Sequence, residues 1–174
     1  VIGIPLRQPG FYAIELARRG NKVFFLNPPA QESGKAGITL MPSGVHENLF
    51  FIEHGLWFPY NLKFHLLWLF HFLMRGHVTK ILAAIGEPVD IVWSFDLGNL
   101  YPLALFGKHP LKIFHPVDEP LNQLAIDSAR GASVIFSVTR EILEKYQAFD
   151  VPRQMINHGL SHEFLDGNGH ASMA

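Results

Sequence analysis

The sequence contains no cysteine among its 174 residues. This absence excludes a disulfide framework, a thiolate metal site and a cysteine nucleophile, and it suits a protein of a reducing compartment. The sequence also lacks an excess of either charge, because 14 lysines and arginines against 15 aspartates and glutamates give a formal net charge of −1. We therefore expect no nucleic-acid partner, since such partners require a strongly basic surface.

Motifs of several cofactor and catalytic classes are missing as well. No GxGxxG sequence follows the first expected strand, and no serine lies in the GxSxG setting of a hydrolase nucleophile. The ten histidines include no HExxH motif. His65, His71 and His77 recur every six residues, a spacing that does not place them on one face of a helix. We expect no metal ion and no dinucleotide cofactor.

Short apolar runs alternate with helical segments along the whole chain. Gly20 is placed to end the first helix, and Thr139 is placed to cap the last. The alternation predicts an α/β fold with a Rossmann-like, open, mostly parallel sheet and helices on both faces. We expect one domain over 1–165 and a small polar tail over 166–174. The expected strands lie at 1–4, 22–27, 38–41, 49–52, 91–93, 111–114, 133–137 and 154–157, and the expected helices at 11–19, 61–84, 100–106, 121–130 and 140–149.

The longest expected helix, over 61–84, is apolar nearly all round in its first half. A helix that spans a membrane needs about 20 mostly apolar residues, and the run 64–74 is shorter and contains two histidines. Gly76 is the expected position of a break or kink. Two interpretations remain open: a buried or interface helix, or a helix that lies on a membrane surface. The second would place Lys63, Arg75 and Lys80 near lipid headgroups, with Trp68 at the boundary.

Polar residues gather directly after the two strands expected at 91–93 and 111–114. Asp96 and Asn99 follow the first of these strands, and His115 follows the second. In parallel sheets, ligands bind just outside the carboxyl ends of the strands. Asp96 and Asn99 are therefore candidates for ligand contacts, although Asn99 is equally placed to cap a helix that begins at residue 100.

Two further groups are candidates at other strand ends. Asp118 and Glu119 either bind sugar hydroxyls or act as a general base, or they cap the helix expected from 121, where acidic side chains suit the helix dipole. Arg7 and Gln8 lie in the first strand-to-helix turn. They either meet an anionic group at the helix N-terminus or are solvated turn residues.

Four segments of the chain carry recognisable motifs: RQP with a helix, an RG turn and a strand ending in PP over 7–29, DIVWSF at 90–95, VDE at 117–119, and the strand and turn over 129–164. In this order they resemble the N-terminal domain of a GT-B glycosyltransferase of the retaining, family-4-like kind. The similarity extends to bacterial teichuronic-acid and other cell-surface polysaccharide glycosyltransferases. The chain departs from that pattern at Ala132-Ser133, where the family has an aspartate, and in the spacing around His158. It also stops where the family's second domain would begin.

The resemblance implies a bacterial cytoplasmic enzyme, with a peripheral contact of 61–75 with the inner face of the membrane as a further expectation. It would supply the acceptor-side half of a cleft, where a sugar passes to a saccharide or lipid-linked acceptor. The nucleotide-sugar donor would bind the missing domain, so this chain would be inactive alone and hold no cofactor. Its catalytic residues stay unassigned, and the alternative is a non-catalytic Rossmann-like binding or interaction module. The implied acceptor contacts are Arg7, Gln8, Asp96, Asn99, His115, Asp118 and Glu119, and the implied interdomain hinge is Asn157 and Gly159.

Overall fold

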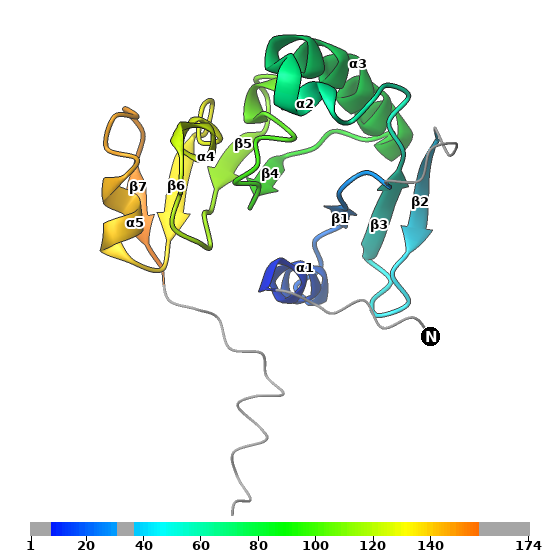
Figure 1. Ribbon diagram of the computed structural model, residues 1–174. Coiled ribbons are helices and arrows are strands. Elements are labelled where there is room, and N and C mark those ends of the chain that lie inside the picture. Colours follow the sequence, from blue (N-terminus) through cyan, green and yellow to red (C-terminus); the bar gives the residue numbers. More distant parts are fainter. Residues whose placement is uncertain (1–7, 31–36, 157–174) are drawn as a thin grey trace, which may run out of the picture.

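The computed structural model describes residues 8–30 and 37–156, and it is an α/β protein, as the sequence predicts (Figure 1). Short strands alternate with helices in both halves of the chain. The first half contains α1 (Gln8–Arg18), β1 (Val23–Leu26), β2 (Ile38–Pro42), β3 (Leu49–His54), α2 (Leu62–His65) and α3 (Leu67–Ile85). The second half contains β4 (Ile91–Ser94), the 3-10 helix η1 (Leu103–Phe106), β5 (Leu111–Phe114), α4 (Gln123–Asp127), β6 (Val134–Ser137), α5 (Arg140–Glu144) and β7 (Arg153–Met155).

The described strands form two sheets, where the sequence led us to expect one. The second half gives a sheet of order β4-β5-β6-β7, in which every pair is parallel. The first half gives a sheet of order β1-β3-β2, in which β1 is parallel and β2 antiparallel to β3. Within the described residues, β1 and β4 are therefore edge strands. The strand expected at 1–4 lies outside them.

Helix ends follow local chemistry in several places. Gly20 takes a φ of 86° directly after α1, so the predicted C-terminal glycine is confirmed. Thr139 caps α5 as predicted, because its hydroxyl accepts the backbone N–H of Ile142 at 3.3 Å.

The helix expected over 61–84 is divided at Leu66, which has φ −140° and ψ 65°. The break expected at Gly76 is wrong, since α3 runs straight through that residue.

One face of α3 is buried and the opposite face is exposed. Phe70, Met74, Val78 and Ile81 are almost fully buried, and Phe70 packs edge-on against the ring of Phe58 with centroids 5.6 Å apart. This ring contact holds the start of α3 against the segment that precedes α2, across the break at Leu66. The structure therefore makes α3 a half-buried helix. No helix among the described residues is long and apolar enough to cross a membrane.

A buried polar junction joins elements of both halves. The His77 Nε2 and His54 Nδ1 atoms are 2.8 Å apart, and His54 Nε2 lies 2.7 Å from the Tyr101 hydroxyl and 3.0 Å from the Asn27 carbonyl oxygen. Tyr101 donates to that same carbonyl at 3.0 Å. A consistent assignment has His77 donating to His54 and His54 donating to Tyr101 and Asn27, with both imidazoles neutral.

The pKa values of this junction follow from its burial. Burial, the neighbouring His54 and Lys80 together lower the pKa of His77 to about 4. Burial also lowers the pKa of His54, against the opposing hydrogen bond to Asn27. Burial and the nearby Asp96 carboxylate raise the pKa of Tyr101. The junction is therefore neutral at physiological pH, and it ties β1, β3 and α3 to the loop that follows β4.

Candidate binding site

The loop over 95–102, between β4 and η1, is organised by the carboxylate of Asp96; we call it the Asp96 loop. One carboxylate oxygen accepts the backbone N–H of Gly98 at 2.9 Å. The other accepts the N–H groups of Leu100 at 2.6 Å and Tyr101 at 2.9 Å. Hydrogen bonds to an ionised carboxylate are stronger than neutral ones. Asp96 therefore stabilises the conformation of the loop, and both of its carboxylate oxygens accept hydrogen bonds.

Asn99 has a different role from the helix cap that the sequence suggested. Its φ is +50°, and it is the only non-glycine residue with a positive φ in the described part of the chain. Asn tolerates this left-handed conformation better than most residues. No helix begins at residue 100, and the cap prediction for Asn99 is wrong because Asp96 already satisfies the N–H groups of Leu100 and Tyr101.

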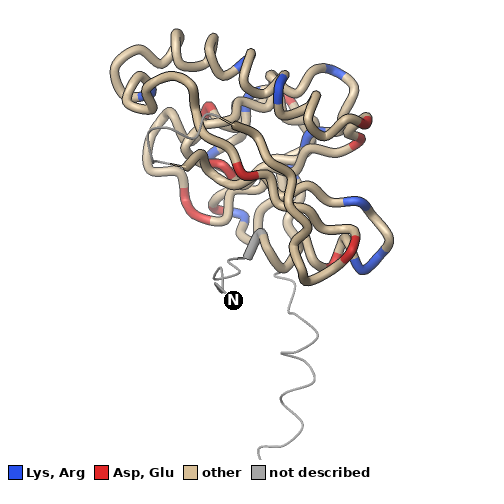
Figure 2. Tube along the Cα trace, turned by 90° about the vertical axis from the view of Figure 1, so that its right-hand side faces the viewer, with Lys and Arg blue, Asp and Glu red and all other residues tan. Residues whose placement is uncertain are grey.

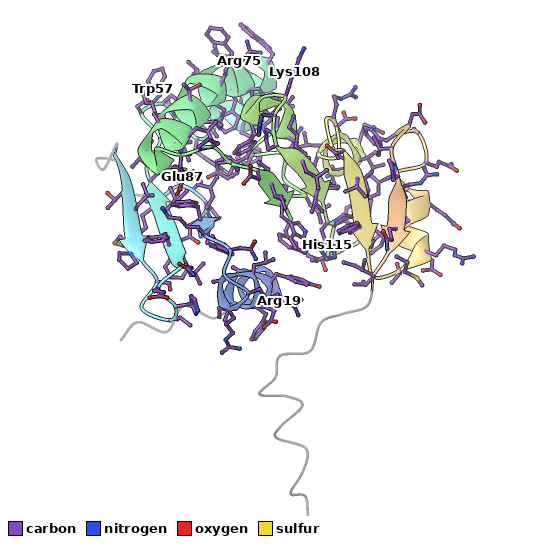
Figure 3. The ribbon with its side chains drawn as sticks, turned by 180° about the vertical axis from the view of Figure 1, so that it is seen from behind. Arg19, Trp57, Arg75, Glu87, Lys108 and His115 are labelled. Atoms are coloured by element: carbon purple, nitrogen blue, oxygen red, sulfur yellow. The ribbon has the colours of Figure 1, made fainter. Side chains whose placement is uncertain are left out.

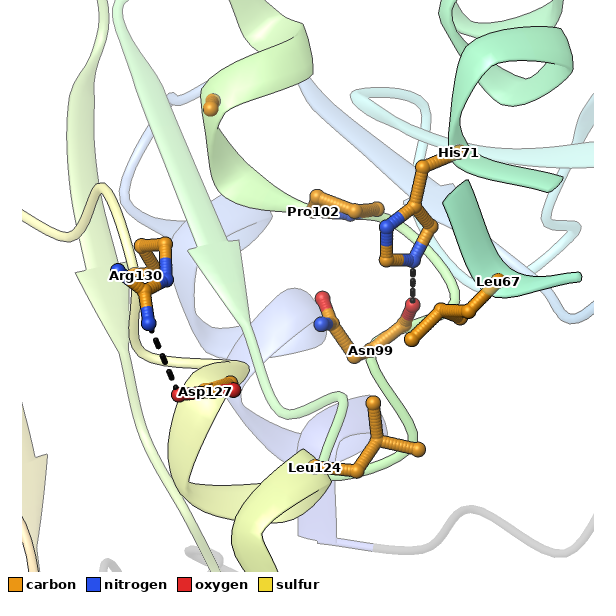
Figure 4. A pocket seen from close by; sticks show the side chains of 8 residues that line it. Leu67, His71, Asn99, Pro102, Leu124, Asp127 and Arg130 are labelled. Atoms are coloured by element: carbon orange, nitrogen blue, oxygen red, sulfur yellow. Dashed lines mark hydrogen bonds and ion pairs between the residues drawn. The ribbon is translucent and has the colours of Figure 1, made fainter. Parts of the chain in front are cut away.

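The side chain of Asn99 lines a pocket of about 240 Å³ between α3, the Asp96 loop and α4 (Figure 4). This volume lies just below the range of roughly 300–1,000 Å³ for drug-sized ligands, so the pocket suits a small ligand. His71 and Asn99 line it beside Asp127 and Arg130, and Leu67 and Leu124 contribute apolar surface. Four polar side chains from three segments thus converge on one small space.

These polar groups offer both donors and acceptors to a ligand. His71 Nε2 lies 3.0 Å from the carbonyl oxygen of Asn99, so this nitrogen donates and Nδ1 is left as an acceptor (Figure 4). Arg130 and Asp127 form an ion pair of 3.1 Å whose side chains are partly exposed. Such a pair is weak and can exchange its partner for a ligand. The Asn99 amide adds one more donor and one more acceptor, a combination that suits vicinal hydroxyl groups.

A cluster of four rings lies at the carboxyl ends of β4 and β5; we call it the edge cluster. Tyr12 of α1 stacks on Phe95, and Trp93 stacks on Phe95 from within the cluster, with centroids 5.9 and 5.7 Å apart. His115 is buried, and its ring lies 5.1 Å from that of Phe95 and 5.7 Å from that of Tyr12. Figure 3 labels His115 on the side of the parallel sheet where α1 lies. The buried Trp93 Nε1 has no hydrogen-bond partner among the residues the structure describes.

The structure separates Asp118 and Glu119 from these features. Both side chains are exposed, and Glu119 forms an ion pair with Lys145 at 3.3 Å. The prediction that they cap the next helix is wrong. That helix, α4, begins at Gln123 and is capped by Asn122, whose side-chain oxygen accepts the N–H of Ala125 at 3.0 Å.

The remaining candidates are only partly placed. Gln8 begins α1, but its side chain is not described. Arg7, Asn157 and Gly159 lie outside the described residues. Of the predicted residues, the structure places Asp96 and Asn99 in one loop, and it places His115 in the edge cluster against Phe95, which begins that loop. Only Asn99 of these three lines the pocket. No group of three or more potential ligands for a metal ion occurs within 8–30 and 37–156.

Sequence reasoning missed His71, Asp127, Arg130 and Tyr12. The spacing of Asp127 and Arg130, three apart near the end of a helix, is compatible with an ion pair. Nothing in the sequence indicates that this pair faces His71, which comes from a helix more than 50 positions earlier. Tyr12 was read only as part of a helix, although it joins the edge cluster.

The chain matches no family model, no curated protein and no solved structure.

Proposed function

We propose that this chain binds a saccharide and forms the acceptor-side half of a GT-B glycosyltransferase. The pocket beside the Asp96 loop carries the proposal. Asn99, His71, Asp127 and Arg130 give a small space with alternating donors and acceptors, which is the chemistry that a sugar hydroxyl requires. The order of the sequence segments supports the enzyme class.

The residues of the pocket would bind and orient an acceptor. Asp127 would accept from hydroxyls, Arg130 would donate to ring or hydroxyl oxygens, and Asn99 would do both. Asp96 would act through Asn99, because it holds the loop that presents the amide. The apolar side chains of Leu67 and Leu124 would contact the C–H face of the sugar ring.

A non-catalytic saccharide-binding module is the second candidate. One observation favours it: of the side chains that line the pocket, only Asp127 is a carboxylate, and it is paired with Arg130, so the pocket lining presents no unpaired carboxylate as a general base. In a GT-B enzyme a second α/β domain would supply the donor. The two candidates therefore differ in whether the protein that contains this chain together with a donor domain, which we call the parent protein, transfers sugar.

Two measurements test the proposal. A ¹⁵N NMR titration of the chain with a panel of mono- and disaccharides is expected to shift the amide signals of Asn99 and His71 and the side-chain signal of Arg130. Shifts scattered elsewhere, or none for any sugar, would refute saccharide binding. Transfer of labelled sugar from a panel of nucleotide sugars by the parent protein is expected for the enzyme, and saccharide binding without any transfer would leave the non-catalytic module.

A further inference from the structure

Six large apolar side chains are exposed along one short stretch of the structure; we call them the aromatic ridge. They come from the segment before α2, from α2 itself, from the break at Leu66 and from the first turns of α3. Phe64 and Trp68 are 70 % exposed and Phe72 is 66 % exposed, values that a water-facing surface rarely shows for neighbouring aromatic residues. The ridge consists of Trp57, Tyr60, Phe64, Leu66, Trp68 and Phe72.

The exposure follows from the geometry of α3. Trp68, Phe72, Arg75 and Thr79 are spaced four, three and four apart, so they form one stripe along the helix. All four are exposed, whereas the buried residues of α3 occupy the opposite face. The exposure of this stripe is therefore not the result of a poorly packed core. It is the exposed side of a helix whose opposite side is already buried in the core.

The segment that carries the ridge has charged side chains of one sign. No Asp or Glu occurs between Glu53 and Glu87, and the helices α2 and α3 carry no acidic position in Figure 2. Arg75 lies in the stripe, and Lys80 Nζ lies 6.0 Å from the centre of the Trp57 ring. Figure 3 places Trp57 and Arg75 along α3 at the outer edge of the molecule. Glu87 at the far end pairs with Lys22.

We propose that the aromatic ridge docks this protein on the surface of an anionic lipid bilayer. Trp and Tyr rings favour the boundary between headgroups and acyl chains, where Trp57, Tyr60 and Trp68 would lie. Arg75 and Lys80 would meet anionic headgroups, and each such cation contributes about a fivefold gain in affinity. The stripe is exposed on α3, and no helix among the described residues could span a membrane, so the docking is peripheral.

A second copy of the chain is a poorer occupant. A twofold contact brings the same patch of each copy together. Arg75 and Lys80 would then face the same cations of the other copy, and the ridge has no acidic residue to pair with them. An anionic bilayer satisfies both the apolar rings and the cations.

Co-sedimentation of the chain with vesicles tests the proposal. Wild type is expected to pellet with vesicles that contain phosphatidylglycerol and much less with phosphatidylcholine alone. Trp68→Ser combined with Phe72→Ser is expected to lose at least tenfold in affinity, and Arg75→Glu combined with Lys80→Glu is expected to abolish the preference for phosphatidylglycerol. All four positions are exposed, so the variants are expected to fold, which circular dichroism would verify.

Two control variants make the result specific to the ridge. Leu121 is 92 % exposed and lies elsewhere, so Leu121→Ser removes an equally exposed apolar side chain. Arg140→Glu reverses an exposed cation of α5, outside α2 and α3. Both controls are expected to pellet as wild type does. No pelleting of wild type, pelleting that the ridge variants retain, or a concentration-dependent dimer in place of vesicle binding would each overturn the proposal.

Discussion

Replacing Asp96 with alanine tests how the Asp96 loop is held. The change removes three hydrogen bonds from backbone N–H groups to one carboxylate, at 2.9, 2.6 and 2.9 Å. A hydrogen bond to a charged group contributes roughly 1.5–3 kcal/mol, and water can replace part of this because the loop is half-buried. We expect a loss of about 3 kcal/mol in the free energy of unfolding, a large share of the 5–15 kcal/mol typical of a domain.

Urea unfolding followed by circular dichroism measures this loss. With a typical slope for a small protein, the midpoint is expected to fall by roughly 1–2 M urea. Asp96→Asn keeps one acceptor oxygen and is expected to lie between alanine and wild type. The matched control is Asp118→Ala, which removes an exposed carboxylate and is expected to change stability by less than about 0.5 kcal/mol. Equal effects of Asp96→Ala and Asp118→Ala would refute the structural role of Asp96.

Three other predictions follow from single side chains. The pKa of His77 falls from 6.5 to about 4 on folding, so the neutral form stabilises the fold above pH 6.5 and this stabilisation is lost as the pH falls towards 4. Unfolding free energies across that window are expected to drop by about 3 kcal/mol on account of His77, since each pKa unit is worth about 1.4 kcal/mol, and a flat profile would contradict this. Asn99→Val is expected to cost about 2 kcal/mol because a β-branched residue resists the φ of +50°, and a calorimetric melt that matches wild type would exclude that strain. Gly76→Ala is expected to raise the unfolding free energy by about 1 kcal/mol, because the added methyl group meets open space on an exposed helix face, and a lower melting temperature would show otherwise.

Local sequence signals predicted those parts of the fold that depend on local interactions. Short continuous apolar runs identified the strands, because strands of a parallel sheet are covered on both faces and need apolar side chains on both. The cap at Thr139 was predictable since a threonine hydroxyl reaches an N–H group three residues later. The same rule applied to Asp118 and Glu119 failed, because α4 begins later and Asn122 is in the capping position.

Features that depend on tertiary contacts were not predictable. The break at Leu66 contains neither glycine nor proline, and the rings of Phe58 and Phe70 meet only after the chain has folded back. Likewise, Gly76 is a poor helix former by propensity, yet packing of the opposite face keeps α3 continuous through it. The division of the strands between two sheets also depends on pairing, which a strand pattern does not specify.

Only part of the candidate site could be predicted from the sequence. Asp96 and Asn99 were identified because polar residues that follow a strand of a parallel sheet lie at a ligand-binding edge. No local pattern indicates that the Asp96 side chain bonds to the backbone of its own loop while the Asn99 side chain lines a pocket. His71 and Arg130 reach that pocket from α3 and from the end of α4, so only the packing of those helices brings them together.

Saccharide affinity of the Asn99→Gly variant tests the central claim most directly. Glycine accepts a positive φ, so the loop and the carbonyl that His71 contacts are retained while the amide leaves the pocket. The account predicts that the variant folds as wild type does and loses at least tenfold in affinity for the sugar that wild type binds, as measured by NMR titration. Gln147→Ala, at an exposed position of the chain, is expected to bind as wild type does. Unchanged affinity of Asn99→Gly would contradict the account.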